Sequence, residues 1–159
     1  MLNPSLKMKK RCLTGVLMLA WLTIATAPGI ALDNINKSNH GVAIKGYDPV
    51  AYHTEGRPVK GKKEYSSKWN DAEWYFANEE NRNMFAGNPE RYAPQYGGYC
   101  ARSLSTTGRP AGVDPETFRI IDGKLYLNWD AEAADRFEAR AAENIKIADL
   151  NWEKLTRKR

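Results

Sequence analysis

The chain has 159 residues, of which 42% are hydrophobic, 11% aromatic and 27% charged. This length is sufficient for one domain with a hydrophobic core, and the composition excludes a disordered chain. The formal net charge is +5, but four cations lie within residues 1–31, and the remainder carries 20 basic against 19 acidic residues. A nearly neutral remainder lacks the clustered basic face that nucleic acid requires, so we expect no nucleic-acid partner.

The N-terminal segment has the pattern of a secretory signal peptide. The cationic start MLNPSLKMKKR precedes the apolar run CLTGVLMLAWLTIATA, and small residues with cleavage-site spacing end at Ala27 and Ala31. The apolar stretch from Leu13 to Ala27 falls short of the roughly 20 residues that span a bilayer. Cys12 precedes this stretch, whereas a lipidated cysteine normally follows the apolar stretch, so we expect no lipidation. We predict that residues 1–31 are removed, leaving a periplasmic or secreted protein without a stable membrane span.

The chain after the signal peptide divides into three parts. Residues 32–41 are polar and predict a loose lead-in, residues 42–155 form the domain proper, and residues 156–159 are a basic tail typical of a solvated chain end. Short β-rich and helical runs follow one another without a regular strand–helix period. This order predicts a small single α+β domain with short antiparallel strands in hairpins and a long C-terminal helical segment.

The first half of the domain predicts a hairpin followed by a helix. Two strands are expected around Glu64–Lys68 and Glu73–Ala77, with Trp74 and Phe76 on one face. Asn78 is a suitable N-cap for the helix after them, because its side-chain oxygen accepts free backbone N–H groups of the first turn.

The second half predicts another hairpin and then the long helical segment. Asp122-Gly123 favours a tight turn between two β-rich runs. The residues expected on the core face of this hairpin are Phe118, Ile120, Leu125 and Leu127. Asp130 is a cap for the helical segment, whose apolar residues recur at three- and four-residue spacing and predict a core-facing stripe. The stripe consists of Phe137, Ala141, Ile145, Ala148 and Trp152.

Cys100, in the stretch QYGGYCA, is the only cysteine after residue 31. A single cysteine closes no internal disulfide, so Cys100 is buried and inert, bound to a metal, or paired with another molecule. Gly97-Gly98 lacks the pattern of a phosphate-binding loop and instead permits a sharp turn that presents the thiol. The Ser-, Thr-, Gly- and Pro-rich stretch 102–114 predicts an irregular loop beside it. We therefore expect Cys100 to be partly accessible in a cleft.

His40 and His53 are the two candidate imidazole partners of Cys100. His40 lies in the predicted lead-in, where a solvated side chain is expected. His53 follows the stretch DPVAY and is the one of the two that could face the thiol; the alternative for His53 is a structural histidine. No positioned acid–base pair accompanies the cysteine in the sequence. An enzyme with a cysteine nucleophile is therefore a weaker hypothesis than a binding domain or an interaction module.

The stretches GYDPVAYHTEG, WYFANEENRNMFAGNPERYAPQYGGYCA and DGKLYLNW resemble an exported bacterial branch of the YHS-domain family, from Gly41 to Trp152. The wider family is similar to small cysteine-rich metal-binding modules, often attached to copper-transporting ATPases. In those modules one Cys follows Asp-Pro-Val and two more follow the Tyr-Phe strand. This sequence has Ala51, Ala77 and Asn81 there, so the soft thiolate set that selects Cu(I) or Zn(II) is missing.

The resemblance leaves Cys100 as the candidate metal ligand, with His53 as a possible second one. Such a pair makes a poor tetrahedral zinc site but suits low-coordinate Cu(I), if a partner or a second copy supplies a soft ligand. We therefore expect a non-enzymatic, exported binding domain that handles a transition metal, with a copper ion favoured, or a thiol-reactive ligand. Its partner would be an envelope protein or a metal donor or acceptor. The alternative is a structural or protein-interaction module of the cell envelope with a buried, inert cysteine.

Overall fold

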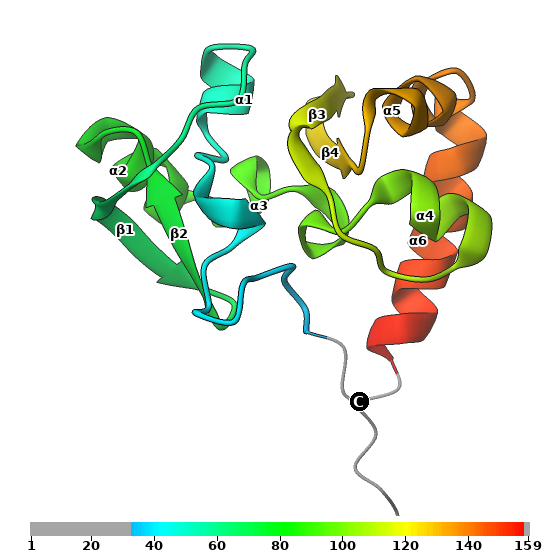
Figure 1. Cartoon of the computed structure of the whole chain (residues 1–159), viewed down its shortest axis with the longest axis horizontal. Coiled ribbons are helices and arrows are strands. Elements are labelled where there is room, and N and C mark those ends of the chain that lie inside the picture. Colours follow the sequence, from blue (N-terminus) through cyan, green and yellow to red (C-terminus); the bar gives the residue numbers. More distant parts are fainter. Residues whose placement is uncertain (1–32, 158–159) are drawn as a thin grey trace, which may run out of the picture. The chain divides into compact units, whose positions relative to one another are not determined.

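The computed structural model describes residues 33–157, which belong to one compact unit, Ala31–Arg159. The predicted signal peptide and the end of the basic tail lie outside the described residues. In chain order the elements are the 3₁₀ helix η1 (Ile44–Gly46), α1 (Ala51–Thr54), β1 (Lys62–Trp69), β2 (Ala72–Phe76), α2 (Glu79–Gly87), α3 (Pro89–Tyr92), the 3₁₀ helix η2 (Gln95–Gly98), α4 (Ala101–Thr107), β3 (Asp114–Ile121), β4 (Lys124–Asn128), α5 (Ala131–Glu138) and α6 (Ala141–Thr156) (Figure 1).

Two antiparallel hairpins, β1–β2 and β3–β4, form separate two-stranded sheets with helices around them, of which α6 is the longest (Figure 1). This arrangement confirms the predicted α+β class with hairpins and a C-terminal helical segment. No helix within residues 33–157 is long and apolar enough to cross a membrane.

The first hairpin confirms the predicted core face. Trp74 and Phe76 of β2 are fully buried, and both rings pack against Phe85 of α2, with ring centroids 5.2 and 5.1 Å apart. Helix α2 begins as predicted, because Asn78 Oδ1 accepts the backbone N–H of Asn81 at 2.8 Å. The alternation along β2 therefore sets the face on which α2 packs.

Asp48 is a fully buried carboxylate that joins three elements. Its Oδ1 accepts the backbone N–H groups of Val50 and Ala51 at 2.8 and 3.3 Å, where α1 begins. Its Oδ2 accepts the backbone N–H of Ala77 at 2.8 Å, just after β2, and Nδ2 of Asn81 in α2 at 2.6 Å. A buried carboxylate is tolerated when hydrogen bonds replace its lost hydration, and here both oxygens are satisfied.

The second hairpin confirms the predicted turn and register. Asp122 and Gly123 have φ angles of 51° and 73°, and Ile120 pairs with Leu125. Leu125 and Leu127 are fully buried, as predicted, whereas Ile120 is 38% exposed, so its predicted core position is wrong. The reason is tertiary: β4 contacts η2, α3, α4 and α5, whereas the main contacts of β3 are with β4 and α5.

Strand β4 is buried on both faces. Leu125 and Leu127 belong to a core cluster that includes Trp74 of the first hairpin. Tyr126, between them, belongs to a second cluster with Phe137. The strand therefore separates two parts of the core, although period-2 alternation predicts only one buried face.

The C-terminal helical segment is divided between α5 and α6, at Ala139 and Arg140. The predicted cap is confirmed, because Asp130 Oδ1 accepts the backbone N–H of Ala133 at 2.7 Å. In the predicted stripe, Phe137 and Ala148 are fully buried, whereas the other three residues are half-buried. These three are Ala141, Ile145 and Trp152.

Residues 102–114, predicted to be an irregular loop, contain most of α4, so this prediction is wrong. Leu104 is fully buried and α4 packs on α6. The hydroxyl of Thr106 donates to the carbonyl oxygen of Arg102 at 2.8 Å, inside the helix. Gly108 closes the helix in the left-handed region, with φ 66°. Packing against α6 thus outweighs the low helix propensity of Ser and Thr.

Residues 33–41, expected to be loose, make contacts with the glycine turn of η2. Ile35 is buried, and the backbone N–H of Asn36 donates to the carbonyl oxygen of Gly97 at 2.8 Å. Gly97 has φ 61°, and a Cβ placed there would lie 1.8 Å from the carbonyl oxygen of Asn34. The glycine is therefore required for this close approach as well as for the turn.

Candidate functional site

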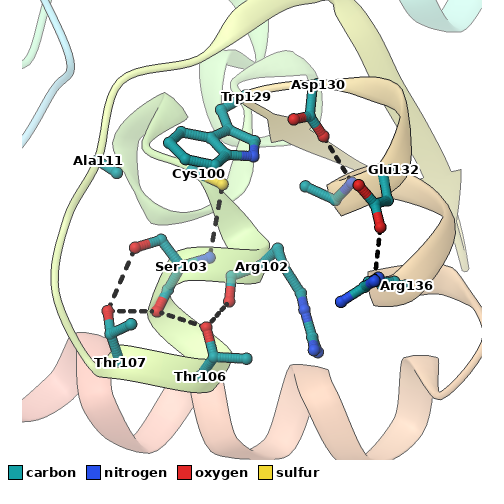
Figure 2. Close-up of a pocket in the computed structure, with 11 residues that line it drawn as sticks. Cys100, Arg102, Ser103, Thr106, Thr107, Ala111, Trp129, Asp130, Glu132 and Arg136 are labelled. Atoms are coloured by element: carbon teal, nitrogen blue, oxygen red, sulfur yellow. Dashed lines mark hydrogen bonds and ion pairs between the residues drawn. The ribbon is translucent and has the colours of Figure 1, made fainter.

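A cavity of about 290 Å³ lies between α4, α5 and the segment that precedes α5 (Figure 2). Its lining residues are Cys100, Arg102, Ser103, Thr106, Thr107, Ala111, Trp129, Asp130, Glu132, Ala133 and Arg136. They come from two stretches that lie far apart in the sequence. Helices α4 and α5 both contact β4 and also contact each other, which brings the two stretches together.

Cys100 forms part of the cavity wall but is only 1% exposed. The prediction of a partly accessible thiol is therefore wrong for the described structure. The Sγ atom caps α4 by accepting the backbone N–H of Ser103 at 3.4 Å, and the thiol lies 3.9 Å from Oδ1 of Asn128. Cys100 thus stands at the start of a helix in place of the predicted loop, and its side chain belongs to the core cluster that includes Leu125 and Leu127.

His53 lies in α1 and has different surroundings from Cys100. Its ring meets Tyr92 edge-on, with centroids 5.6 Å apart, and its Nε2 atom is buried without a hydrogen-bond partner among the described residues. His53 does not line the cavity beside Cys100. His40 is exposed. Within residues 33–157, no three His, Cys, Asp or Glu side chains form a group that could hold a metal ion.

Burial lowers the pKa of His53, and the charge of Arg91 lowers it further, against the opposing effect of a hydrogen bond with the backbone of Tyr92. A folded-state pKa below the unfolded value means that the unfolded chain binds the proton more readily. The free energy of unfolding is therefore expected to fall as the pH drops below about 6.5, the usual histidine pKa.

Replacing His53 with Phe should flatten this pH dependence, because Phe keeps a ring against Tyr92 but takes up no proton. Urea unfolding of the wild type and the variant between about pH 5 and pH 8 measures the effect. The exposed His40, changed to Gln, is the control and should leave the slope unchanged. If the free energy of unfolding depends equally on pH in wild type and His53→Phe, His53 is not the source of this pH dependence.

Arg102 carries an unpaired positive charge at the cavity. Its Nη1 donates to the neutral amide oxygen of Asn144 at 3.2 Å, and it makes no ion pair with any residue in the described range. The other lining arginine, Arg136, pairs with Glu132 at 2.5 Å. Asp130 caps α5 through Oδ1. The cavity thus offers unused guanidinium N–H donors from Arg102.

Trp129 is the exposed aromatic residue of the cavity, with 62% of its surface accessible. It directly follows Asn128, which is fully buried and whose Oδ1 accepts the backbone N–H of Arg102 at 3.0 Å. The Nδ2 atom of Asn128 is buried without a partner among the described residues. The sequence identifies neither Arg102 nor Trp129 as a residue of the site. For Trp129, strand alternation predicts the same face as the buried Leu127 and gives no signal for exposure.

Two candidate ligand-binding tyrosines, Tyr96 of the cysteine motif and Tyr52, have structural roles. Tyr96 is buried and its hydroxyl donates to Asp149 Oδ1 at 2.9 Å. Tyr52 is buried and its hydroxyl donates to the carbonyl oxygen of Pro115 at 2.8 Å. Burial raises the pKa of both phenols, so both stay protonated over the physiological pH range.

The described structure is thus a small α+β domain with a cavity between two of its helices. Residues 50–96, less than half of the chain, match the family model of the YHS domain. No curated protein and no solved structure matches the chain significantly. The matched segment includes His53 and the first hairpin, whereas Cys100 and the other residues of the cavity wall follow it.

Proposed function

We propose that this protein is an exported, non-enzymatic YHS-domain binding protein, periplasmic or secreted, whose ligand site is the cavity beside Cys100. The observation that carries this proposal is the position of the thiol in the wall of a cavity of about 290 Å³. The signal-peptide pattern of residues 1–31 supports export.

A transition metal, with copper favoured, or a thiol-reactive ligand is the proposed occupant at Cys100. A thiolate is a soft ligand suited to Cu(I), whereas the carboxylates of Asp130 and Glu132 in the same wall are hard oxygen ligands. A second soft ligand would therefore come from a partner, either an envelope protein that donates or accepts the metal or a second copy of the chain.

The alternative function is a structural or protein-interaction module of the cell envelope. The observation that favours it is the burial of Cys100, which is 1% exposed, belongs to the core and caps α4. In this alternative the thiol serves packing and helix capping, and another envelope protein binds the surface.

Cu(I) titration in competition with a chelator tests the metal-binding proposal. Wild-type protein should take up Cu(I), and Cys100→Ser should lose this binding without unfolding, because Ser keeps an acceptor at the N-cap of α4. The affinity should also fall as the pH drops, since protons compete for the sulfur. His53→Ala is the matched control, and it should leave Cu(I) affinity unchanged because His53 does not line the cavity.

Thiol labelling distinguishes the two functions. A cysteine that serves as a ligand should react with a small thiol reagent in the native protein, and bound Cu(I) should protect it. If Cys100 reacts only after denaturation and wild-type protein takes up no Cu(I), the interaction module is the correct function. Metal analysis of protein purified from its own cell envelope would identify the bound ion directly.

A further inference from the structure

The cavity beside Cys100 has two chemically distinct ends. In Figure 2 the indole of Trp129 lies over the thiol of Cys100, while the guanidinium group of Arg102 lies at the opposite end of the lining residues. Ala111 and Ala133 add apolar surface to the wall. One end is thus apolar and aromatic, and the other carries a positive charge.

The positive end is a favourable position for an anionic group. Arg102 makes one side-chain hydrogen bond, to the amide of Asn144, and has no carboxylate partner within residues 33–157. Guanidinium groups bind carboxylates through two parallel hydrogen bonds, which makes this pairing both strong and specific.

The two carboxylates of the cavity wall have partners of their own. Asp130 accepts the backbone N–H of Ala133 at the N-terminus of α5, and Glu132 pairs with Arg136. The hydroxyls in the wall are also occupied: those of Ser103 and Thr107 donate to the carbonyl oxygens of Arg109 and Ser103, both at 2.9 Å. Arg102 is therefore the arginine of the cavity wall whose guanidinium has no carboxylate partner among the described residues.

We propose that the cavity binds a small amphipathic carboxylate, whose carboxylate pairs with Arg102 and whose apolar body lies against Trp129. This inference rests on the proposed function, in which the same cavity is the ligand site, and names its ligand class. A volume of about 290 Å³ lies just below the roughly 300–1,000 Å³ of ligand pockets, so the ligand is no larger than a single ring with a short acidic side chain.

Phenylacetate and its neutral analogue phenylacetamide are matched probes for this proposal, because they share the ring and differ in charge. Isothermal titration of full-length wild-type protein should show phenylacetate binding at least about tenfold more tightly than phenylacetamide, the effect of a charge-assisted hydrogen bond. Arg102→Gln should remove this preference, and Arg102→Lys should retain part of it. Trp129→Ala should weaken the binding of both probes.

Arg109→Gln is the matched control, since Arg109 is exposed and does not line the cavity. Thermal unfolding of each variant shows whether it is folded. Equal binding of the two probes, an unchanged preference in folded Arg102→Gln, or the absence of phenylacetate binding to wild-type protein would overturn the inference. If phenylacetate fails while wild-type protein binds Cu(I) through Cys100, the carboxylate assignment fails and the proposed function stands. If the native thiol also resists labelling and no Cu(I) binds, the carboxylate assignment and the proposed function both fail.

Discussion

Replacing Asp48 with Ala is expected to lower the free energy of unfolding by about 3–5 kcal/mol, in the upper range for single substitutions. The substitution removes an acceptor that holds four hydrogen bonds in the core. The N–H groups of Val50, Ala51 and Ala77 would then lack this partner, and leaving a buried donor unsatisfied costs about 1–3 kcal/mol. The individual costs do not add fully, because removing a buried carboxylate also removes its own desolvation penalty.

Urea unfolding followed by circular dichroism measures this effect. Asp48→Asn should be less harmful, because the amide keeps one of the two acceptor oxygens. Asp114→Ala is the matched control: Asp114 is exposed and its side chain accepts one backbone N–H, from Glu116 at 3.0 Å. If Asp48→Ala is as stable as Asp114→Ala, the carboxylate does not hold the three elements together.

Replacing Leu127 with Ala is expected to cost about 2–5 kcal/mol, the usual range for a buried leucine truncated to alanine. Leu127 is fully buried in β4, at the centre of the core that joins the two hairpins. Truncation removes apolar contacts and leaves a cavity that a strand contacted by several helices closes only in part.

Guanidinium chloride unfolding of the wild type and the variant measures the loss. Leu150→Ala is the control, since Leu150 is 50% exposed and should cost less than about 1 kcal/mol. A loss for Leu127→Ala as small as that for Leu150→Ala would show that the register of the second hairpin differs from the one described.

The sequence by itself predicted those elements whose signals are local. The turn at Asp122-Gly123 and the caps at Asn78 and Asp130 depend on hydrogen bonds and φ angles within a few residues, and all three are confirmed. The alternation that buries Trp74 and Phe76 is also local, because side chains on a strand point to opposite faces in turn.

The candidate site could be predicted only in part. Cys100 is a candidate from the sequence because it is the only cysteine after residue 31, and it does line the cavity. Its pairing with His53 stayed a hypothesis, and the structure gives the two residues different neighbours. Arg102 and Trp129 share a cavity although they are distant in the sequence, and no local pattern indicates such a pairing.

The tertiary structure decided the features that depend on which elements pack together. Helix α4 forms in a Ser- and Thr-rich stretch because Leu104 is buried and α4 packs against α6, and Cys100 at its N-cap is buried in the core. Ile120 is exposed and Tyr126 is buried because β4, unlike β3, lies between two clusters of the core, one on each face. Local propensities differ by less than about 1 kcal/mol per residue, whereas burying one large apolar side chain contributes about 1.5–3 kcal/mol, so long-range packing prevails where the two conflict.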